Sequence, residues 1–174
     1  MKCSLRATAI AAGLTALAGC TTDSARTDTA AAAMSGESIS IAVGPCFGFC
    51  PVYRTTVTSA GSVIYTGERH TEFIGERRRE AGVAVFSSLS ADLAAYRPAD
   101  GATQQVECDA AITDTSIYTI TWRRADGTEA IATHQSRCSG GPGQKLDTVL
   151  STLPQRLGIT AWAKQVTRPG VSRG

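Results

Sequence analysis

The 174-residue sequence has neither an excess of charge nor a long apolar run. Its formal net charge is +2, with 17 basic against 15 acidic side chains, so it lacks the broad positive field that attracts nucleic acid or anionic lipid. Its apolar run near the amino terminus, Ala7 to Ala18, is shorter than the about 20 residues that span a bilayer. These absences argue against a nucleic-acid-binding protein and against a transmembrane helix at this position.

Motifs of common catalytic sites are absent as well. No G-x-S-x-G occurs, and no pair of carboxylates stands out as acid and base. The stretch "SGGPGQK" lacks the spacing of a phosphate-binding loop, so we interpret it as a loop that caps the last helix. His70 lies beside Glu72 without an identifiable nucleophile. We therefore expect no enzymatic activity, no cofactor, no metal and no nucleic-acid partner.

The first twenty residues have the layout of a targeting signal. Lys2 and Arg6 precede the apolar run, which ends in "LAGC" with Leu17 three positions before Cys20. This ending resembles the lipobox of bacterial lipoproteins. The resemblance implies a diacylglycerol on the Cys20 thiol, cleavage after Gly19 and acylation of the new amino terminus. The alternative is an ordinary cleavable or uncleaved signal in which the cysteine occurs by chance.

Such a lipid anchor places the protein at the cell envelope. Each buried CH₂ contributes about 0.8 kcal/mol, so two or three acyl chains together make a permanent attachment. Thr21 rather than aspartate follows Cys20, a pattern that resembles the outer-membrane address of enterobacterial lipoproteins. We expect a protein that faces the periplasm, with the outer membrane favoured over the inner. Its expected partners are the lipid bilayer, through Cys20, and an envelope protein that the sequence does not identify.

The segment after the lipobox separates the anchor from the folded part. Residues 21–37 contain no aromatic residue and only one long apolar residue, Met34, so they cannot bury enough surface to fold. We predict a signal peptide over 1–19 and a lipidated flexible tether over 20–37. A single α+β domain is expected over 38–166, and a disordered tail over 167–174.

Within the domain, alternating apolar residues predict two β-hairpins. Ile39, Ile41 and Val43 alternate in "SISIAVG", and turns are expected at Ser59-Ala60-Gly61 and at Asp126-Gly127. The expected strands are 38–44, 52–58, 62–66, 116–122 and 128–134, with 70–74 as an extension or a further strand. We interpret "GERRRE", residues 75–80, as a solvated turn.

A helical period follows each hairpin. It predicts a helix over 80–97, open to interruption at 88–91, and a second through Leu146 and Leu153, interrupted at Pro154. The apolar residues Leu157, Ile159 and Trp162 should pack back on the body, and Trp122 should fill the core. The sequence thus predicts an α+β fold: a small antiparallel sheet built from two β-hairpins, each followed by a helix, with the helices packed on one face.

The stretch from Cys46 to Gly67 resembles an uncharacterised bacterial family, domain of unknown function 6438. Its members carry Cys-x-Gly-x-Cys-Pro-x-Tyr, then a strand, a glycine turn and a second strand that ends in Tyr-x-Gly. The matching residues are Cys46, Gly48, Cys50, Pro51, Tyr53, Gly61, Tyr65 and Gly67. The resemblance continues more loosely to about Trp162. It implies a compartment and an architecture but no mechanism, because the family has no assigned activity.

Other proteins also use cysteines at this spacing. Copper chaperones of the thioredoxin-like Sco type have Cys-x₃-Cys-Pro and a downstream histidine, here His134, but their cysteines open a helix that lowers the thiol pKa. A β-branched run follows Cys50 instead. A zinc site of Cys46, Cys50, His134 and Cys138 would leave Cys108 alone, and an exported protein meets an oxidising compartment.

The even count of four cysteines beyond Cys20 favours two disulfides, which allow three pairings. We prefer Cys46 with Cys50, which belong together in the family signature, and Cys108 with Cys138, which bracket the second hairpin. A non-catalytic binding or structural role in the envelope is the expected function. The alternative is a periplasmic thiol-disulfide oxidoreductase or metal carrier that uses Cys46 and Cys50.

Overall fold

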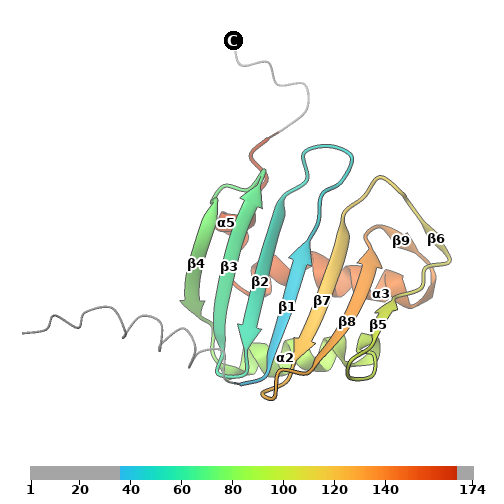
Figure 1. Ribbon diagram of the computed structural model, residues 1–174. Helices are drawn as coiled ribbons and strands as arrows, with labels where there is room; N and C mark the ends of the chain where they lie inside the picture. The colour runs from blue at the N-terminus through green and yellow to red at the C-terminus, as the bar shows by residue number, and fades with distance from the viewer. Residues whose placement is uncertain (1–35, 168–174) are drawn as a thin grey trace, which may run out of the picture.

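The structure is a computed structural model that describes residues 36–167. Its centre is a seven-stranded sheet in the order β4-β3-β2-β1-β7-β8-β5 (Figure 1). All neighbouring strands are antiparallel except β8 and β5, which are parallel. The strands of this sheet are β1 (Ser38–Val43), β2 (Val52–Thr58), β3 (Ser62–Arg69), β4 (Gly75–Glu80), β5 (Thr103–Gln105), β7 (Ile117–Arg123) and β8 (Glu129–Gln135). A second sheet pairs β6 (Ala110–Ala111) with β9 (Cys138–Ser139).

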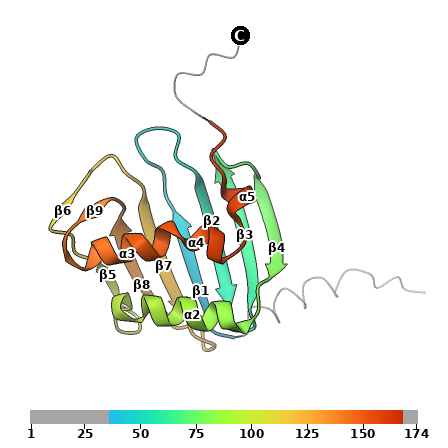
Figure 2. The same cartoon turned by 180° about the vertical axis from the view of Figure 1, so that it is seen from behind.

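The helices lie over one face of the large sheet (Figure 2). Helix α2 crosses it near the end where β1 begins, and α3 and α4 cross it farther along the strands. The helical elements are α2 (Val83–Leu93), the 3-10 helix η1 (Ala94–Tyr96), α3 (Gly141–Ser151), α4 (Leu153–Arg156) and α5 (Thr160–Ala163). Within residues 36–167 no helix has the length and apolar content needed to cross a membrane.

Alternation along the strands separates a core face from a polar face. Ile39 and Ile41 of β1 are buried and lie opposite Trp122 and Ile120 of β7. Leucines of α2 and α3 pack on this face, because each helix presents its apolar stripe to the sheet. Side chains one position along point the other way, onto a face where Ser40 lies between Thr56 and Thr121 of the neighbouring strands. The core therefore lies between the sheet and the helices.

The predicted α+β class is confirmed, but the sheet is larger than two hairpins. The interpretation of residues 75–80 as a solvated turn is wrong, because they form the edge strand β4 beside β3. The expected strand at 70–74 is instead a bent segment outside the strands, in which Thr71 makes an isolated bridge to Gln165. Charged side chains along β4 leave its outer edge unattractive to further strands, which limits edge-to-edge aggregation.

The helix boundaries also differ from those expected. The helix predicted over 80–97 begins at Val83, because Glu80 belongs to β4, and its last turn tightens into η1. It continues without a break through 88–91. The second helix is interrupted at Thr152, ahead of Pro154, because proline fits the first turn of α4. Residues 1–35, with the predicted signal and Cys20, and residues 168–174 lie outside the described residues.

Candidate functional site

The four cysteines of the folded part lie in two pairs at disulfide distance. The Cα atoms of Cys46 and Cys50 are 5.7 Å apart, and those of Cys108 and Cys138 are 5.5 Å apart. Disulfides have Cα separations of about 4.4–6.8 Å. These are the two pairs that we preferred from the sequence. The zinc set with His134 is not assembled, and no three Cys, His, Asp or Glu side chains within residues 36–167 gather as metal ligands.

The loop closed by Cys46 and Cys50 connects β1 to β2 and is held on both sides. The backbone N–H of Phe47 donates to the carbonyl of Asp114, 3.2 Å away, in the segment before β7. On the other side, Gln165 donates from Nε2 to the carbonyl of Phe49 at 2.7 Å. The loop therefore forms a fixed wall at this end of the sheet.

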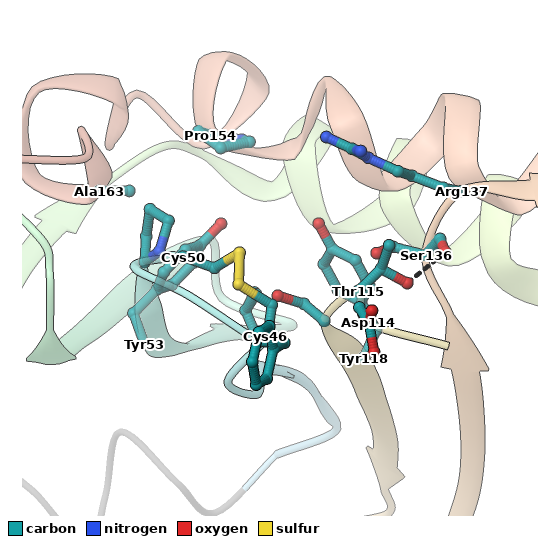
Figure 3. Close-up of a pocket in the computed structure, with 14 residues that line it drawn as sticks. Cys46, Cys50, Tyr53, Asp114, Thr115, Tyr118, Ser136, Arg137, Pro154 and Ala163 are labelled. Carbon is teal, nitrogen blue, oxygen red and sulfur yellow. Dashed lines mark hydrogen bonds between the residues drawn. A yellow bond between two sulfur atoms is a disulfide. The ribbon is translucent and has the colours of Figure 1, made fainter. Parts of the chain in front are cut away.

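A cavity of about 470 Å³ lies against this wall (Figure 3). Its other walls come from the segment before β7, the turn between β8 and β9, and helices α4 and α5. The disulfide of Cys46 and Cys50 faces Tyr118 and Arg137 across the space. The volume lies in the range of about 300–1,000 Å³ that is usual for small-molecule sites.

Two tyrosines supply hydroxyls to the cavity. Within residues 36–167, the Tyr53 and Tyr118 hydroxyls have no hydrogen-bond partner, whereas the Tyr65 hydroxyl donates to the carbonyl of Trp162 at 3.0 Å. Burial raises the pKa of the Tyr53 phenol above its ordinary value of 10.0, and the neighbouring tyrosines add to the shift. Burial, followed by the charge of Asp147, also raises the pKa of Tyr118. Both phenols therefore stay protonated at neutral pH and can donate hydrogen bonds.

Arg137 stands in the turn between β8 and β9 with a backbone φ of 59°. A non-glycine residue in this left-handed region costs about 1–3 kcal/mol, and such strain is common at functional sites. The Arg137 guanidinium makes no ion pair with any residue between 36 and 167, unlike Arg97, Arg124 and Arg156. The strained turn thus presents a free cation to the cavity.

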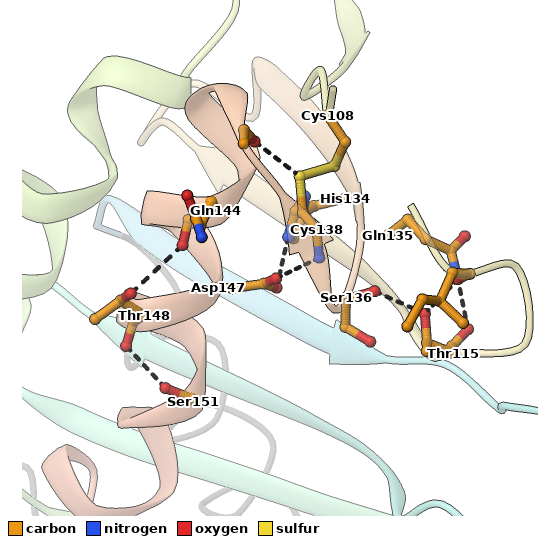
Figure 4. A network of polar contacts seen from close by, with 12 residues as sticks. Cys108, Thr115, His134, Gln135, Ser136, Cys138, Gln144, Asp147, Thr148 and Ser151 are labelled. Atoms are coloured by element: carbon orange, nitrogen blue, oxygen red, sulfur yellow. Dashed lines mark hydrogen bonds and ion pairs between the residues drawn. A yellow bond between two sulfur atoms is a disulfide. The ribbon is translucent and has the colours of Figure 1, made fainter. Parts of the chain in front are cut away.

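A carboxylate holds this turn to α3 (Figure 4). Asp147 accepts a 2.7 Å hydrogen bond from the backbone N–H of Cys138 and a 2.8 Å contact from Nε2 of His134. His134 is fully buried, and its Nδ1 has no partner within the described part of the chain. His134, which the sequence suggested as a metal ligand, is thus a core residue that orients Asp147.

An adjoining cavity of about 510 Å³ shares part of the same wall. Tyr118, Ser136 and Arg137 line both spaces, and Asp147 lines the second alone. The carboxylate of Asp147 keeps both oxygens engaged with His134 and Cys138. The two spaces therefore adjoin each other at Tyr118, Ser136 and Arg137.

Other residues singled out in the sequence have structural surroundings. His70 stacks edge-on against Phe49, with ring centroids 5.3 Å apart, and its Nδ1 lies 3.1 Å from Oγ1 of Thr167. Trp122 is buried and Trp162 packs against the core, as expected. The "SGGPGQK" loop does begin a helix, α3, although α4 and α5 follow it.

The sequence analysis missed Asp114, Tyr118 and Arg137 as site residues. Tyr118 occupies an inward position of the β7 alternation, in line with the buried Ile120, and that signal was available. No local sequence pattern identifies Asp114 or Arg137 as a site residue, because each lies in a turn and lines the cavity only together with segments that are distant in sequence.

Fold and site together define an α+β domain with a cavity walled by a disulfide-closed loop. The chain belongs to the family described as Domain of unknown function (DUF6438), which it matches over residues 37–156. The match includes every strand of both sheets and ends with α4, before α5. No curated protein matches the chain.

One glycine of the family resemblance has a clear physical reason. A Cβ at Gly67 would overlap the carbonyl of Phe73 and press on the hydroxyl of Tyr65. Tyr65 is fully buried, and its hydroxyl reaches the carbonyl of Trp162, which joins β3 to α5. The tyrosine and the glycine two residues later are therefore needed together to seat α5 on the sheet, where it closes the cavity.

Proposed function

We propose that the protein is a lipid-anchored envelope protein whose domain binds a small polar ligand, without catalysis, in the cavity beside Cys46 and Cys50. The observation that carries this proposal is a set of polar side chains that line the cavity and have no partner among residues 36–167. A well-formed cavity with a few convergent polar groups is the usual form of a binding site.

Two independent features support a location outside the cytoplasm. The "LAGC" ending at Cys20 resembles a lipobox, and all four cysteines of the described domain lie at disulfide distance. Structural disulfides persist in oxidising compartments such as the periplasm and are rare in the cytosol. The pattern of Thr21 after Cys20 favours the outer membrane.

The chemistry of the cavity favours binding over catalysis. A hydrolytic site needs a nucleophile within hydrogen-bond reach of a base that a third group orients. Asp147 and His134 do form a pair, but the ring nitrogen that would accept a proton is buried and has no hydroxyl or thiol partner within residues 36–167. The groups that face the cavity are hydrogen-bond donors and acceptors without such an arrangement.

Native mass spectrometry of protein released gently from membranes tests the binding role. Ser136→Phe would put an aromatic ring into the cavity, and Ser139→Phe, on the exposed side of β9, is the matched control. We expect a small molecule bound to the native protein and to the control but not to Ser136→Phe. Equal occupancy of both variants, or no bound molecule on the native protein, contradicts a ligand site in this cavity.

The anchor is tested separately. Cys20→Ser removes the thiol that a lipobox would acylate, so we expect an uncleaved precursor that takes up no labelled palmitate. If the Cys20→Ser protein still lost residues 1–19 and fractionated with membranes, the anchor proposal would be wrong.

A second function is favoured by one observation, that the Cys46–Cys50 pair lines the cavity and is only partly buried. Thiol-disulfide oxidoreductases expose such a pair, but they lower the thiol pKa at a helix N-terminus. Here strand β2 begins at Val52, directly after the pair. Free-thiol counting and insulin reduction decide between the roles: a fully oxidised protein without turnover supports binding, and turnover supports redox exchange.

A further inference from the structure

We infer that the cavity takes a zwitterion, a free amino acid or a short peptide, with its carboxylate on Arg137 and its ammonium group on Asp114. This inference rests on the proposed binding function and names the class of ligand. It comes from two opposite charges that line one cavity and are paired neither with each other nor with any other residue from 36 to 167.

Hydrogen bonds join the two turns that carry these charges. Oγ1 of Thr115, next to Asp114, donates to the carbonyl of Ser136, next to Arg137, at 2.7 Å. Gln135 adds a second link, because its Nε2 donates to the carbonyl of Thr115 at 2.9 Å. These bonds join the turn before β7 to the turn after β8, so the backbone segments that carry Asp114 and Arg137 lie next to each other.

Asp114 and Arg137 line the same cavity without forming an ion pair with each other. A ligand with only a negative charge would satisfy Arg137 but meet the carboxylate of Asp114, and a simple cation would meet the opposite problem. A molecule that carries both charges satisfies both groups. Arginine offers the planar pair of donors that a carboxylate accepts, and an ammonium group donates to a single carboxylate.

The remaining surface suits the uncharged part of such a ligand. The hydroxyls of Tyr53 and Tyr118, which have no partner in the described part of the chain, can bond a peptide amide. Phe47, which is 90% exposed, and the disulfide beside it offer apolar contact at the rim. A strained Arg137 backbone is also consistent with a side chain kept in place for a ligand, because glycine would relieve the strain.

Four matched dipeptides test the inference by calorimetry on the purified full chain. Alanyl-alanine carries both charges, its N-acetyl form only the carboxylate, its amide only the ammonium, and the doubly capped form neither. We expect alanyl-alanine to bind about tenfold more tightly than either singly capped form, since a charged hydrogen bond is lost with each cap. The doubly capped form should show no measurable binding.

Two variants should give a crossed pattern. Arg137→Gln should weaken binding of alanyl-alanine and of its N-acetyl form but leave the amide unchanged, and Asp114→Asn should do the reverse. Arg124→Gln, whose guanidinium pairs with Asp100 at 2.8 Å, is the matched control and should change neither. Arg137→Gly separates folding from binding: it should raise the melting temperature, because the strained φ is relieved, and still lose carboxylate binding.

Equal affinity for all four dipeptides, absence of binding by any of them, or loss of amide binding in Arg137→Gln overturns the zwitterion. The proposed function then still stands if the native protein carries a molecule of another class that Ser136→Phe excludes. If no molecule of any kind depends on the cavity, the proposed function fails as well.

Discussion

The two disulfides should contribute very differently to stability. The bond between Cys108 and Cys138 joins residues 30 apart in sequence, and that between Cys46 and Cys50 joins residues 4 apart. The loop-closure entropy that a cross-link removes from the unfolded chain corresponds to about 3.6 kcal/mol for the longer loop and about 1.9 kcal/mol for the shorter. The pair of substitutions Cys108→Ser with Cys138→Ser should therefore destabilise the domain about twice as much as Cys46→Ser with Cys50→Ser.

The surroundings of Cys138 should add to the loss. Its backbone N–H donates to Asp147, and Gly143 of α3 packs directly on both sulfurs of the longer cross-link. Removing the bond loosens β9, which carries that hydrogen bond. We therefore expect a loss of free energy of unfolding of at least about 3 kcal/mol for the longer cross-link.

Urea unfolding of the full chain, followed by circular dichroism, measures both losses under the same conditions. Peptide mapping of the native protein under non-reducing conditions provides the control that both bonds are formed. An equal or greater loss on removing Cys46 and Cys50 would refute the reasoning. A peptide that joins Cys108 to Cys46 or Cys50 would refute the pairing itself.

Three further changes follow from individual contacts. Gly143→Ala would improve helix propensity, yet its Cβ would lie 2.6 Å from Sγ of Cys138, so we expect the melting temperature to fall. The fall should be smaller when Gly143→Ala is made in the variant that lacks the Cys108–Cys138 bond. Asp147→Ala should cost about 2–4 kcal/mol by thermal unfolding, because two buried donors lose their acceptor, whereas Asp92→Ala, at an exposed ion pair, should cost about 0–1 kcal/mol. Burial raises the pKa of Tyr53 in the folded state, so above about pH 10 the Tyr53 phenol loses its proton more readily in the unfolded chain, and the free energy of unfolding should fall as the pH rises. Melting temperatures measured across this pH range should fall less steeply for Tyr53→Phe than for the native protein. An equal slope for the two proteins would contradict this reasoning.

Much of the sheet was predictable because its central strands carry a clear alternation. Ile39, Ile41 and Val43 point into the core, and short turns with glycine fix both hairpins. Strand β4 gave no such signal, because its side chains are charged on both faces. The residues of β4 on the helix-covered side of the sheet are arginines at its exposed edge. The Arg77 guanidinium lies 3.9 Å from the centre of the Phe73 ring, and Arg79 donates to the carbonyl of Gly158 at 2.8 Å. Backbone pairing with β3, rather than burial, makes it a strand.

The candidate site was beyond the reach of sequence reasoning for a topological reason. Local turns show that β2 pairs with β3 and β7 with β8, but they do not show which strand β1 joins. In the structure β1 lies between β2 and β7 and so connects the two halves of the sheet. This placement brings the loop after Val43 beside the segment before Ile117, where the backbone N–H of Gly44 donates to the carbonyl of Ile117 at 2.9 Å. The cavity exists only at that junction.

The same junction explains why so small a ring as Cys46–Cys50 is useful. Its effect on the unfolded chain is about half that of the longer bond, and it also sets the folded shape of the wall that it closes. That wall faces Tyr118 and Arg137, which come from the other half of the sheet. Under the proposed function, loss of this bond should loosen the wall and weaken ligand binding strongly, while it lowers the melting temperature less than loss of Cys108–Cys138 does. Loss of Cys108–Cys138 should do the opposite, because that bond lies beside β9 and α3, outside the cavity.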